Sequence, residues 1–496
     1  MMAFRHSIAP GSGKSAQPLS AFFVIAALLL GITIAFARLE VALFLLVVSG
    51  VSLLFLIAPL SAIGFLVLLA PLRTLIATES ALRMPLDIGQ LLLIAALGVW
   101  ALHRMLWQRS FRLAFSSVFI PLIIFIAGTG LSGFTAHSMS AWLNEWLKWI
   151  QVLILAIVCL DLARERRWEW LLFFIVLSAV ANALVGIYQF FGGSGALHLL
   201  INDRFFRAFG TFGQPNPFGG MMGLIAPLCF MASLGYGLRA WALRQHSRSA
   251  ALPAAMISLF YLGCFGIIAA ALLMSWSRGA WLGFAVSMFI TLILIPRRVV
   301  NALLLMGVVA LSVIGLWSTG RLPASIVERV SSAFQETFTT NDVRGVDIDP
   351  ENYALVERLA HWQAAVNMAT EHHYLGVGFG NYEIAYPNYR LLNWKFPLGH
   401  AHNYYLNVLA ETGIIGLTAY VVLWLLLIGF TMRTRQHPDL LARSVTVGLM
   451  GTWTYLLVHS LTDNLYVNNL FLLLAVMFGM LAVLYNQCHS PSHLRT

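Results

Sequence analysis

Residues 41–70 read VALFLLVVSGVSLLFLIAPLSAIGFLVLLA, a run of apolar and small residues divided only by Pro59. Stretches of about 18 or more apolar residues recur along the chain, and each is long enough to cross the hydrocarbon core of a bilayer. The chain is 59% hydrophobic and 10% charged, whereas an average soluble domain is about 25% charged. The composition therefore predicts an all-α, polytopic membrane protein instead of a set of soluble domains.

The hydropathy pattern predicts a transmembrane bundle of about 12–14 spans. Fourteen are expected at 20–37, 41–58, 60–77, 87–106, 115–133, 143–160, 169–191, 217–238, 253–274, 279–296, 299–317, 404–430, 443–461 and 467–485. The second and third could instead be short or re-entrant helices, so 41–77 forms either one span or two. The expected parts are a cytoplasmic tail (1–19), a helical bundle (20–317), an outer loop (318–402), C-terminal helices (403–485) and a cytoplasmic tail (486–496). Residues 1–19 lack a cleavage site, so the first span is expected to be retained.

The distribution of basic residues predicts the orientation. Seventeen of the 30 Lys and Arg residues fall in segments assigned to the cytoplasm, against six in short outer connections and six in the long loop. Positive charge favours the cytoplasmic side of a membrane. Both termini are therefore expected inside a cytoplasmic (inner or plasma) membrane and the loop outside, which explains the net charge of +10 without a nucleic-acid partner.

The loop 318–402 is the only long polar segment and is expected to form a folded lid over a site at the membrane surface. Residues 353–370 have an amphipathic helical pattern, and the glycines of Gly376-Val377-Gly378 suit a tight turn. Four aromatic residues follow, which either stack on sugars or anchor the loop at the membrane interface: Tyr386, Tyr389, Trp394 and Phe396.

Three outer arginines stand in distinctive settings. Arg278 lies in the tight link Ser275–Trp281, where an unpaired cation inside the membrane would cost at least about 2.5–3.5 kcal/mol; it either binds an anion or reaches lipid phosphates. Arg207 precedes a Gly- and Pro-rich turn leading into a helix start, a natural anion site, or belongs to a plain surface loop. Arg358 either contacts a substrate or pairs with a neighbouring carboxylate.

His402 is the candidate general base, because it ends the loop at the membrane surface and a histidine pKa lies near neutrality. A belt histidine is the alternative. His400 and His402 show no third metal ligand at a recognisable spacing, so no metal is expected there. Asp347-Ile348-Asp349 resembles a metal-binding DxD pattern but sits in an acidic stretch. The four cysteines show no disulfide or metal pattern.

Several motifs together resemble the O-antigen ligase/polymerase superfamily. They are His402-Asn403 followed after nine residues by Gly413-Ile414-Ile415-Gly416, the Ser277-Arg278-Gly279 turn, Arg207…Gly210-Thr211-Phe212…Pro215-Asn216-Pro217, and Gly376-Val377-Gly378…Asn381-Tyr382. The resemblance covers roughly residues 204–485, and the first 200 residues match only as a string of spans.

The resemblance implies a GT-C-like membrane glycosyltransferase that acts without a metal or other cofactor. It implies that Arg207 and Arg278 hold the diphosphate of a polyprenyl-diphosphate-linked glycan and that His402 deprotonates the acceptor hydroxyl. Further candidates for substrate binding are Arg358, Asn403, Asn216 and Tyr382. Fixed guanidiniums can stabilise a diphosphate leaving group, and the lack of a carboxylate pair favours inversion. The acceptor stays open among lipid A core, a lipid-linked glycan and a protein hydroxyl.

Two other classes compete with the enzyme. A transporter of a small anion such as bicarbonate would place ionisable groups near the bilayer midplane. Lys148, with Glu145 three residues before it, is the main charge within a span. A non-catalytic scaffold for envelope assembly leaves the outer arginines unexplained. Convergence of Arg207, Arg278 and His402 in one outward cavity would favour the enzyme.

Overall fold

The computed structural model describes residues 38–79, 86–109, 113–164, 166–193, 196–201, 204–296, 342–348 and 352–489, together with residue 33 and isolated positions between 300 and 319. The chain divides into two compact units, Met1–Ser61 and Ala62–Thr496. In the first unit, helix α2 (Leu39–Ile57) is apolar throughout, and only 6% of its most apolar window is buried. A helix that is apolar on all sides is typical of a membrane span.

The second unit is helical except for one short hairpin, among the residues that the structure describes. Its elements, the first of which begins two residues before the boundary, are α3 (Leu60–Leu69), η1 (Ala70–Leu72), α4 (Arg73–Glu79), α5 (Ile88–His103), η2 (Arg104–Gln108), η3 (Ser117–Phe119), α6 (Ile120–Gly130), η4 (Leu131–Thr135), α7 (Met139–Leu162), α8 (Trp168–Tyr188), η5 (Gln189–Gly193), η6 (Leu197–Leu199), β1 (Leu200–Ile201), β2 (Phe205–Phe206), α9 (Pro215–Arg244), α10 (Arg248–Met274), α11 (Arg278–Leu294), α14 (Tyr353–Glu371), α15 (Tyr382–Tyr389), α16 (Tyr404–Thr434), α17 (Leu440–His459) and α18 (Leu470–His489).

Twelve of the fourteen predicted spans coincide with a helix or a short series of helices. The other two, 20–37 and 299–317, lie outside the continuously described residues. Within the described part of the chain, ten helical segments are long and apolar enough to cross a membrane, and α11 is a shorter apolar helix. Residues 41–77 form two such segments, Glu40–Ile57 and Leu60–Glu79. The predicted polytopic helical bundle is therefore confirmed.

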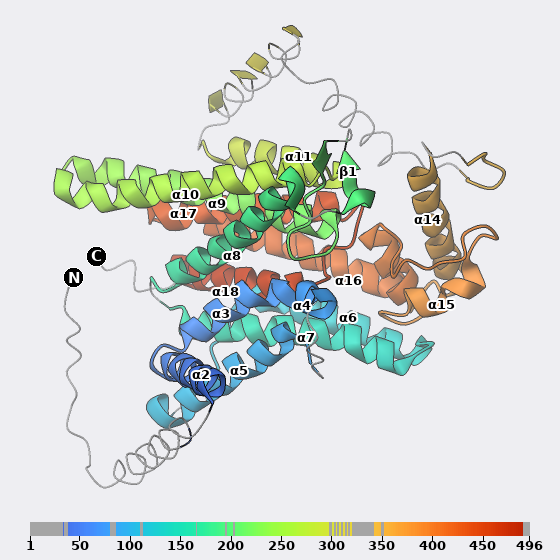
Figure 1. Cartoon of the computed structure of the whole chain (residues 1–496), viewed down its shortest axis with the longest axis horizontal. Helices are drawn as coiled ribbons and strands as arrows, with labels where there is room; N and C mark the ends of the chain where they lie inside the picture. The colour runs from blue at the N-terminus through green and yellow to red at the C-terminus, as the bar shows by residue number, and fades with distance from the viewer. Residues whose placement is uncertain are drawn as a thin grey trace. The chain divides into compact units, whose positions relative to one another are not determined.

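Helices α9 and α18 form the core of the second unit, with 78% and 83% of their apolar windows buried. Helix α9 packs against α10 and α17, and α18 packs against α7 (Figure 1). Glycines permit the close approach of α9 and α17, as small residues do between membrane helices. A Cβ at Gly223 would overlap the Tyr455 ring, and one at Gly448 would lie 2.8 Å from the Leu228 Cα.

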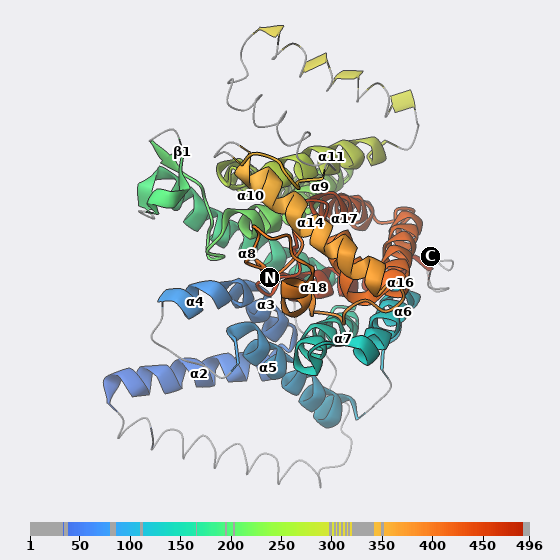
Figure 2. The ribbon, with the colours of Figure 1, turned by 90° about the vertical axis from the view of Figure 1, so that its right-hand side faces the viewer.

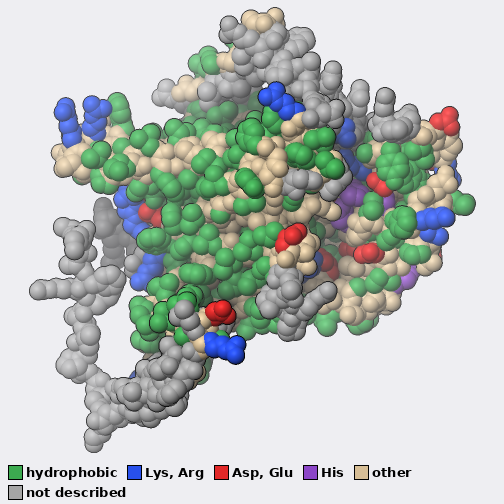
Figure 3. Space-filling model, in the orientation of Figure 1, with side chains coloured by type: hydrophobic (Ala, Val, Ile, Leu, Met, Phe, Trp, Pro, Cys, Tyr) green, Lys and Arg blue, Asp and Glu red, His purple; other side chains and the backbone are tan. Residues whose placement is uncertain are grey.

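Helix α14 confirms the helix predicted over 353–370. It lies across one end of the bundle, near the start of α16, as the two ribbon views show (Figures 1 and 2). Figure 3 shows an apolar surface over the middle of the helices, basic side chains at the far end of α9 and α10, and histidines near α14. An apolar band between two polar ends is the pattern of a membrane-spanning bundle.

Candidate functional site

Two histidines and one carboxylate meet at the end of the bundle where α14 lies. His400 and His402 come from the segment before α16, and Asp463 comes from the link between α17 and α18. The Asp463 Oδ1 atom lies 3.5 Å from His400 Nε2 and 3.9 Å from His402 Nδ1. The second distance is too long for a hydrogen bond, and His402 Nδ1 is buried without a hydrogen-bond partner among the described residues.

The backbone of His402 is held in an unusual conformation. Its φ of 53° is in the left-handed region, which costs a residue other than glycine about 1–3 kcal/mol and often marks functional sites. The His402 N–H donates to His400 Nδ1 at 3.0 Å. Because His400 Nδ1 accepts this bond, neutral His400 carries its proton on Nε2, the atom that faces Asp463. The turn therefore fixes both imidazoles relative to the carboxylate.

The local charges favour neutral imidazoles beside an ionised carboxylate. Burial is the main cause that lowers the pKa of His400 and of His402, and the positive charge of Arg358 adds to it; Asp463 opposes it. Burial raises the pKa of Asp463. The neighbouring groups lower it by more, so that the pKa falls below its usual value; they are His400, His402, His459 and the Asn464 backbone N–H. A neutral imidazole next to a carboxylate is suited to accept a proton.

Helix α14 contributes Arg358 and His361, which are one turn apart and face this cluster. The His361 ring lies 5.9 Å from the His402 ring and stacks on Tyr386 at 4.8 Å. The His361 Nδ1 atom lies 3.0 Å from the Tyr382 hydroxyl, which also donates to the His361 backbone oxygen at 3.1 Å. Tyr382 is fully buried. Its hydroxyl therefore holds His361 in place in this structure.

Asn403 begins helix α16. Its side-chain oxygen accepts from the backbone N–H groups of Tyr405 and Leu406, at 3.0 and 3.1 Å. This is the usual bonding of a helix N-cap, which satisfies orphan donors of the first turn. Asn403 is 9% exposed. Its hydrogen bonds to the first turn of α16 fix the backbone directly after His402.

The predicted anion-binding arginines lie on neighbouring segments. Arg207 follows the hairpin of β1 and β2, where Leu200 pairs with Phe206. The Arg207 Nε donates to the Ser275 backbone oxygen at 3.2 Å, in the turn that carries Arg278. An Arg207 terminal nitrogen also donates to Asn216 Oδ1 at 3.4 Å, at the start of α9. The structure thus brings Arg207, Asn216 and the Arg278 turn together.

The Arg278 turn packs against the residues beside Asp463. A Cβ at Gly279 would overlap Thr462 Oγ1 and would lie 3.2 Å from His459 Cδ2. Only glycine fits this approach, and Thr462 is the neighbour of Asp463 in the chain. Arg207 therefore contacts the Arg278 turn, this turn contacts the α17–α18 link, and Asp463 in that link lies beside the histidines. The sequence motifs thus lie at one end of the bundle.

The two glycine motifs pack against each other beneath this end. Helix α16 is interrupted at Gly413, whose φ is 63°. The freed backbone groups pair with the Gly376 turn: Val377 N–H donates to Ala410 O at 3.0 Å, and Gly378 N–H donates to Glu411 O at 2.9 Å. Gly376 and Gly378 have φ of 66° and 103°, so the predicted tight turn is confirmed.

The structure supplies a third potential metal ligand. Ligand atoms of His400, His402 and Asp463 all lie within 4.8 Å of one another, a grouping that could hold a metal ion. The expectation that the two histidines lack a third ligand nearby was wrong, because Asp463 is 61 residues beyond His402 in the chain. The Asp347-Ile348-Asp349 pattern falls partly outside the described residues.

Lys148, which the transporter interpretation relied on, forms an ion pair with Glu145 one turn earlier on α7. The pair neutralises the main charge within that span. Asp463 was the main residue that sequence reasoning missed. The available signal was a carboxylate in a short link that was predicted to face outward, four residues after His459.

Comparison with known proteins identifies one family. Residues 262–421, about a third of the chain, match the model of the family described as O-antigen ligase. The matched segment contains Arg278, Arg358, Tyr382 and His402, whereas Arg207 and Asp463 lie outside it. The match confirms the resemblance predicted from the motifs. None of the curated proteins matches the chain.

Proposed function

Because the chain is a membrane protein of the O-antigen ligase/polymerase superfamily, we propose that it transfers a glycan from a polyprenyl diphosphate to an acceptor hydroxyl. The reaction takes place at the outer face of the cytoplasmic membrane, with both termini inside and the loop 318–402 outside. The observation that carries the proposal is the approach of Asp463 to His402, 3.9 Å apart, at the end of the bundle that also holds the Arg207 and Arg278 turns.

In the proposed reaction His402 is the general base. The acceptor oxygen attacks the anomeric carbon from the side opposite the diphosphate, its proton passes to His402, and the bond from the anomeric carbon to the diphosphate oxygen breaks. The configuration at the anomeric carbon inverts. Polyprenyl diphosphate leaves with the bonding electrons. A positioned base contributes about 10²–10⁴-fold to such a step.

Arg207 and Arg278 bind the diphosphate and stabilise the charge that develops on it. Guanidiniums make charge-assisted, often bidentate hydrogen bonds to phosphate oxygens, and groups fixed before the reaction need little rearrangement. The bond from Arg207 to the Ser275 carbonyl supports the proposal, because it holds this side chain against the Arg278 turn. Asn216 restrains Arg207 from the other side. This division of roles makes the reaction independent of a metal ion.

The test is glycan transfer in proteoliposomes with a polyprenyl-diphosphate-linked glycan, a candidate acceptor and EDTA. His402→Ala, Arg207→Ala and Arg278→Ala are expected to lose transfer and polyprenyl diphosphate release by at least about 100-fold. His373→Ala and Arg204→Ala, which change exposed side chains, serve as matched controls and are expected to retain activity. Folding is checked by gel filtration and thermal melting.

The outcome separates the functional classes. Equal activity of all folded variants would refute the assigned roles. If the wild type transfers no glycan with lipid A core, lipid-linked glycan or protein acceptors, the proposed reaction fails, and bicarbonate uptake is then measured. A product, in contrast, identifies the acceptor directly.

A further inference from the structure

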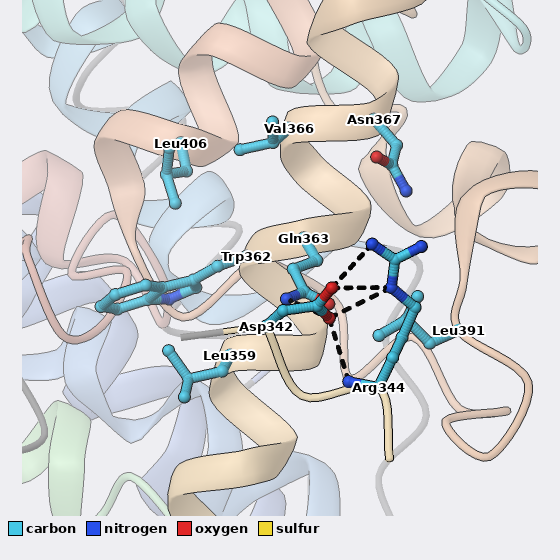
Figure 4. A pocket seen from close by; sticks show the side chains of 9 residues that line it. All are labelled: Asp342, Arg344, Leu359, Trp362, Gln363, Val366, Asn367, Leu391 and Leu406. Atoms are coloured by element: carbon cyan, nitrogen blue, oxygen red, sulfur yellow. Dashed lines mark hydrogen bonds and ion pairs between the residues drawn. The ribbon is translucent and has the colours of Figure 1, made fainter. Parts of the chain in front are cut away.

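A concave feature lies on the face of α14 that turns away from His361. It is a pocket of about 430 Å³, and Figure 4 shows its side chains around the helix. Residues 359, 362, 363, 366 and 367 follow the spacing of a single helical face. Leu391 and Leu406 complete the apolar part of the wall. Together with Asp342 and Arg344, which precede α14, the described residues of four segments build this pocket.

The apolar wall includes the indole of Trp362, between Leu359 and Leu406 in the close view (Figure 4). The side chain of Val366, one turn further along α14, is 45% exposed. A flat aromatic ring with a polar N–H offers both a stacking surface and a hydrogen-bond donor. Ligand sites commonly combine such apolar walls with a few placed polar groups.

The opposite wall is polar but carries no net charge. Arg344 donates from Nε and a terminal nitrogen to Asp342 Oδ2 at 2.9 and 2.7 Å. These bonds to Arg344 hold the pKa of Asp342 well below its usual range, so the pair stays ionised and its charges cancel. Gln363 Nε2 donates to Asp342 Oδ1 at 3.1 Å. The wall therefore presents fixed hydrogen-bonding groups to a neutral ligand.

Two polar atoms of the residues that line the pocket, one from each wall, lack hydrogen-bond partners among the described residues. They are Trp362 Nε1, a donor, and Gln363 Oε1, an acceptor, and both are buried. An unsatisfied buried group costs about 1–3 kcal/mol, and each such group calls for an explanation. A ligand with neighbouring hydroxyl groups would satisfy both atoms once the two side chains turn toward the pocket.

The pocket and the proposed base, His402, lie on opposite sides of helix α14. Trp362 follows His361, whose ring lies 5.9 Å from that of His402, and Arg358 is one turn before Trp362. On the other side, the Leu406 N–H donates to the Asn403 side chain at 3.1 Å, in the turn directly after His402. A ligand in the pocket would therefore bind beside the reacting groups without covering them.

We propose that this pocket binds a neutral pyranose ring of a glycan substrate, stacked on Trp362 and hydrogen-bonded by Gln363 and the Asp342–Arg344 pair. A sugar ring offers an apolar face and several hydroxyl groups, which matches the two walls. The inference rests on the proposed glycan transfer and extends it to a named subsite. The ring belongs either to the donor glycan or to the acceptor.

The first test measures binding without catalysis. The free oligosaccharide of the donor, released from its lipid, and the acceptor glycan are each mixed with the full chain in nanodiscs, and saturation-transfer NMR records contact. The wild type is expected to saturate ring protons of one glycan, and Trp362→Leu is expected to lose the signal. Trp241→Leu, a change at a 66% exposed tryptophan on α9, is the matched control. No signal in the wild type, or an equal signal in Trp362→Leu, would overturn the subsite.

The second test is kinetic and identifies the source of the sugar. Trp362→Leu is expected to raise KM about tenfold for the substrate that the pocket binds, with kcat within about threefold. Trp362→Phe, which keeps a stacking ring, and Gln363→Met, which removes only the amide, are expected to show smaller increases and guard against misfolding of the first variant. A fall in kcat with both KM values unchanged would contradict the inference. If the wild type transfers no glycan, the NMR result still decides the subsite separately.

Discussion

Asp463→Asn tests whether the buried carboxylate assists His402. The substitution keeps the shape of the side chain and an oxygen that can accept from the Asn464 N–H, now 2.8 Å from Asp463 Oδ1. It removes the negative charge 3.9 Å from His402 Nδ1. The variant is therefore expected to fold normally and to lose the stabilisation of the imidazolium that forms as His402 takes the acceptor proton.

The expected loss follows from the distance. Two unit charges about 4 Å apart interact by about 4 kcal/mol at an effective dielectric constant of about 20, and about 1.4 kcal/mol corresponds to a tenfold change in rate. This gives a limit of about 10³-fold. Because the His402 side chain is 21% exposed, water screens part of the interaction, and we expect kcat to fall about 10²–10³-fold.

The assay is the pH dependence of glycan transfer in proteoliposomes. Burial and the charge of Arg358 lower the pKa of His402, whereas the Asp463 carboxylate raises it. Loss of the carboxylate therefore lowers this pKa further. The acid limb of the kcat/KM profile should move to lower pH, and the plateau of the profile should fall. Asp439→Asn, at the N-cap of α17, is the matched control and should retain activity because Asn also caps helices. A kcat within threefold of the wild type, with an unmoved acid limb, would refute the assistance by Asp463.

Three further outcomes are expected. Removal of metal ions with EDTA should leave transfer unchanged; loss of activity that Zn²⁺ restores would show that the histidine–carboxylate group holds a metal. Gly413→Ala should lower the melting temperature, because its φ is 63° and a Cβ would overlap the Tyr374 carbonyl group, a strain of at least about 1–3 kcal/mol. Gly429→Ala on the same helix, with open space around it, should leave the melting temperature unchanged, and equal melting of the two variants would contradict the packing argument. Burial lowers the pKa of His361 to about 4, so below about pH 6.5 the unfolded chain binds a proton that the folded chain does not. The free energy of unfolding should therefore fall as the pH drops from about 6.5 to 4. A smaller fall in His361→Gln would support this, and a pH profile identical to that of the wild type would contradict it.

Local patterns in the sequence determined much of this protein. Runs of apolar residues predicted the bundle, because each span must satisfy its own backbone groups in lipid and therefore forms a helix regardless of its neighbours. Helical periodicity predicted α14, and glycine spacing predicted the turn at Gly376. The motifs around His402 and Gly413 also sufficed to predict the resemblance that the family match over residues 262–421 supports, since they are short segments that stay recognisable without the fold.

Only the tertiary structure decided which side chains meet. Asp463 approaches His402 because α17 and α16 pack in the same end of the bundle, and no spacing in the chain encodes that contact. Tyr382 and Asn403 remain candidates for substrate binding, and only the structure shows that Tyr382 bonds to His361 and that Asn403 caps the first turn of α16. The pocket at Trp362 likewise joins segments far apart in sequence. Hydropathy and periodicity report what each segment does alone, whereas a site depends on the packing of several segments.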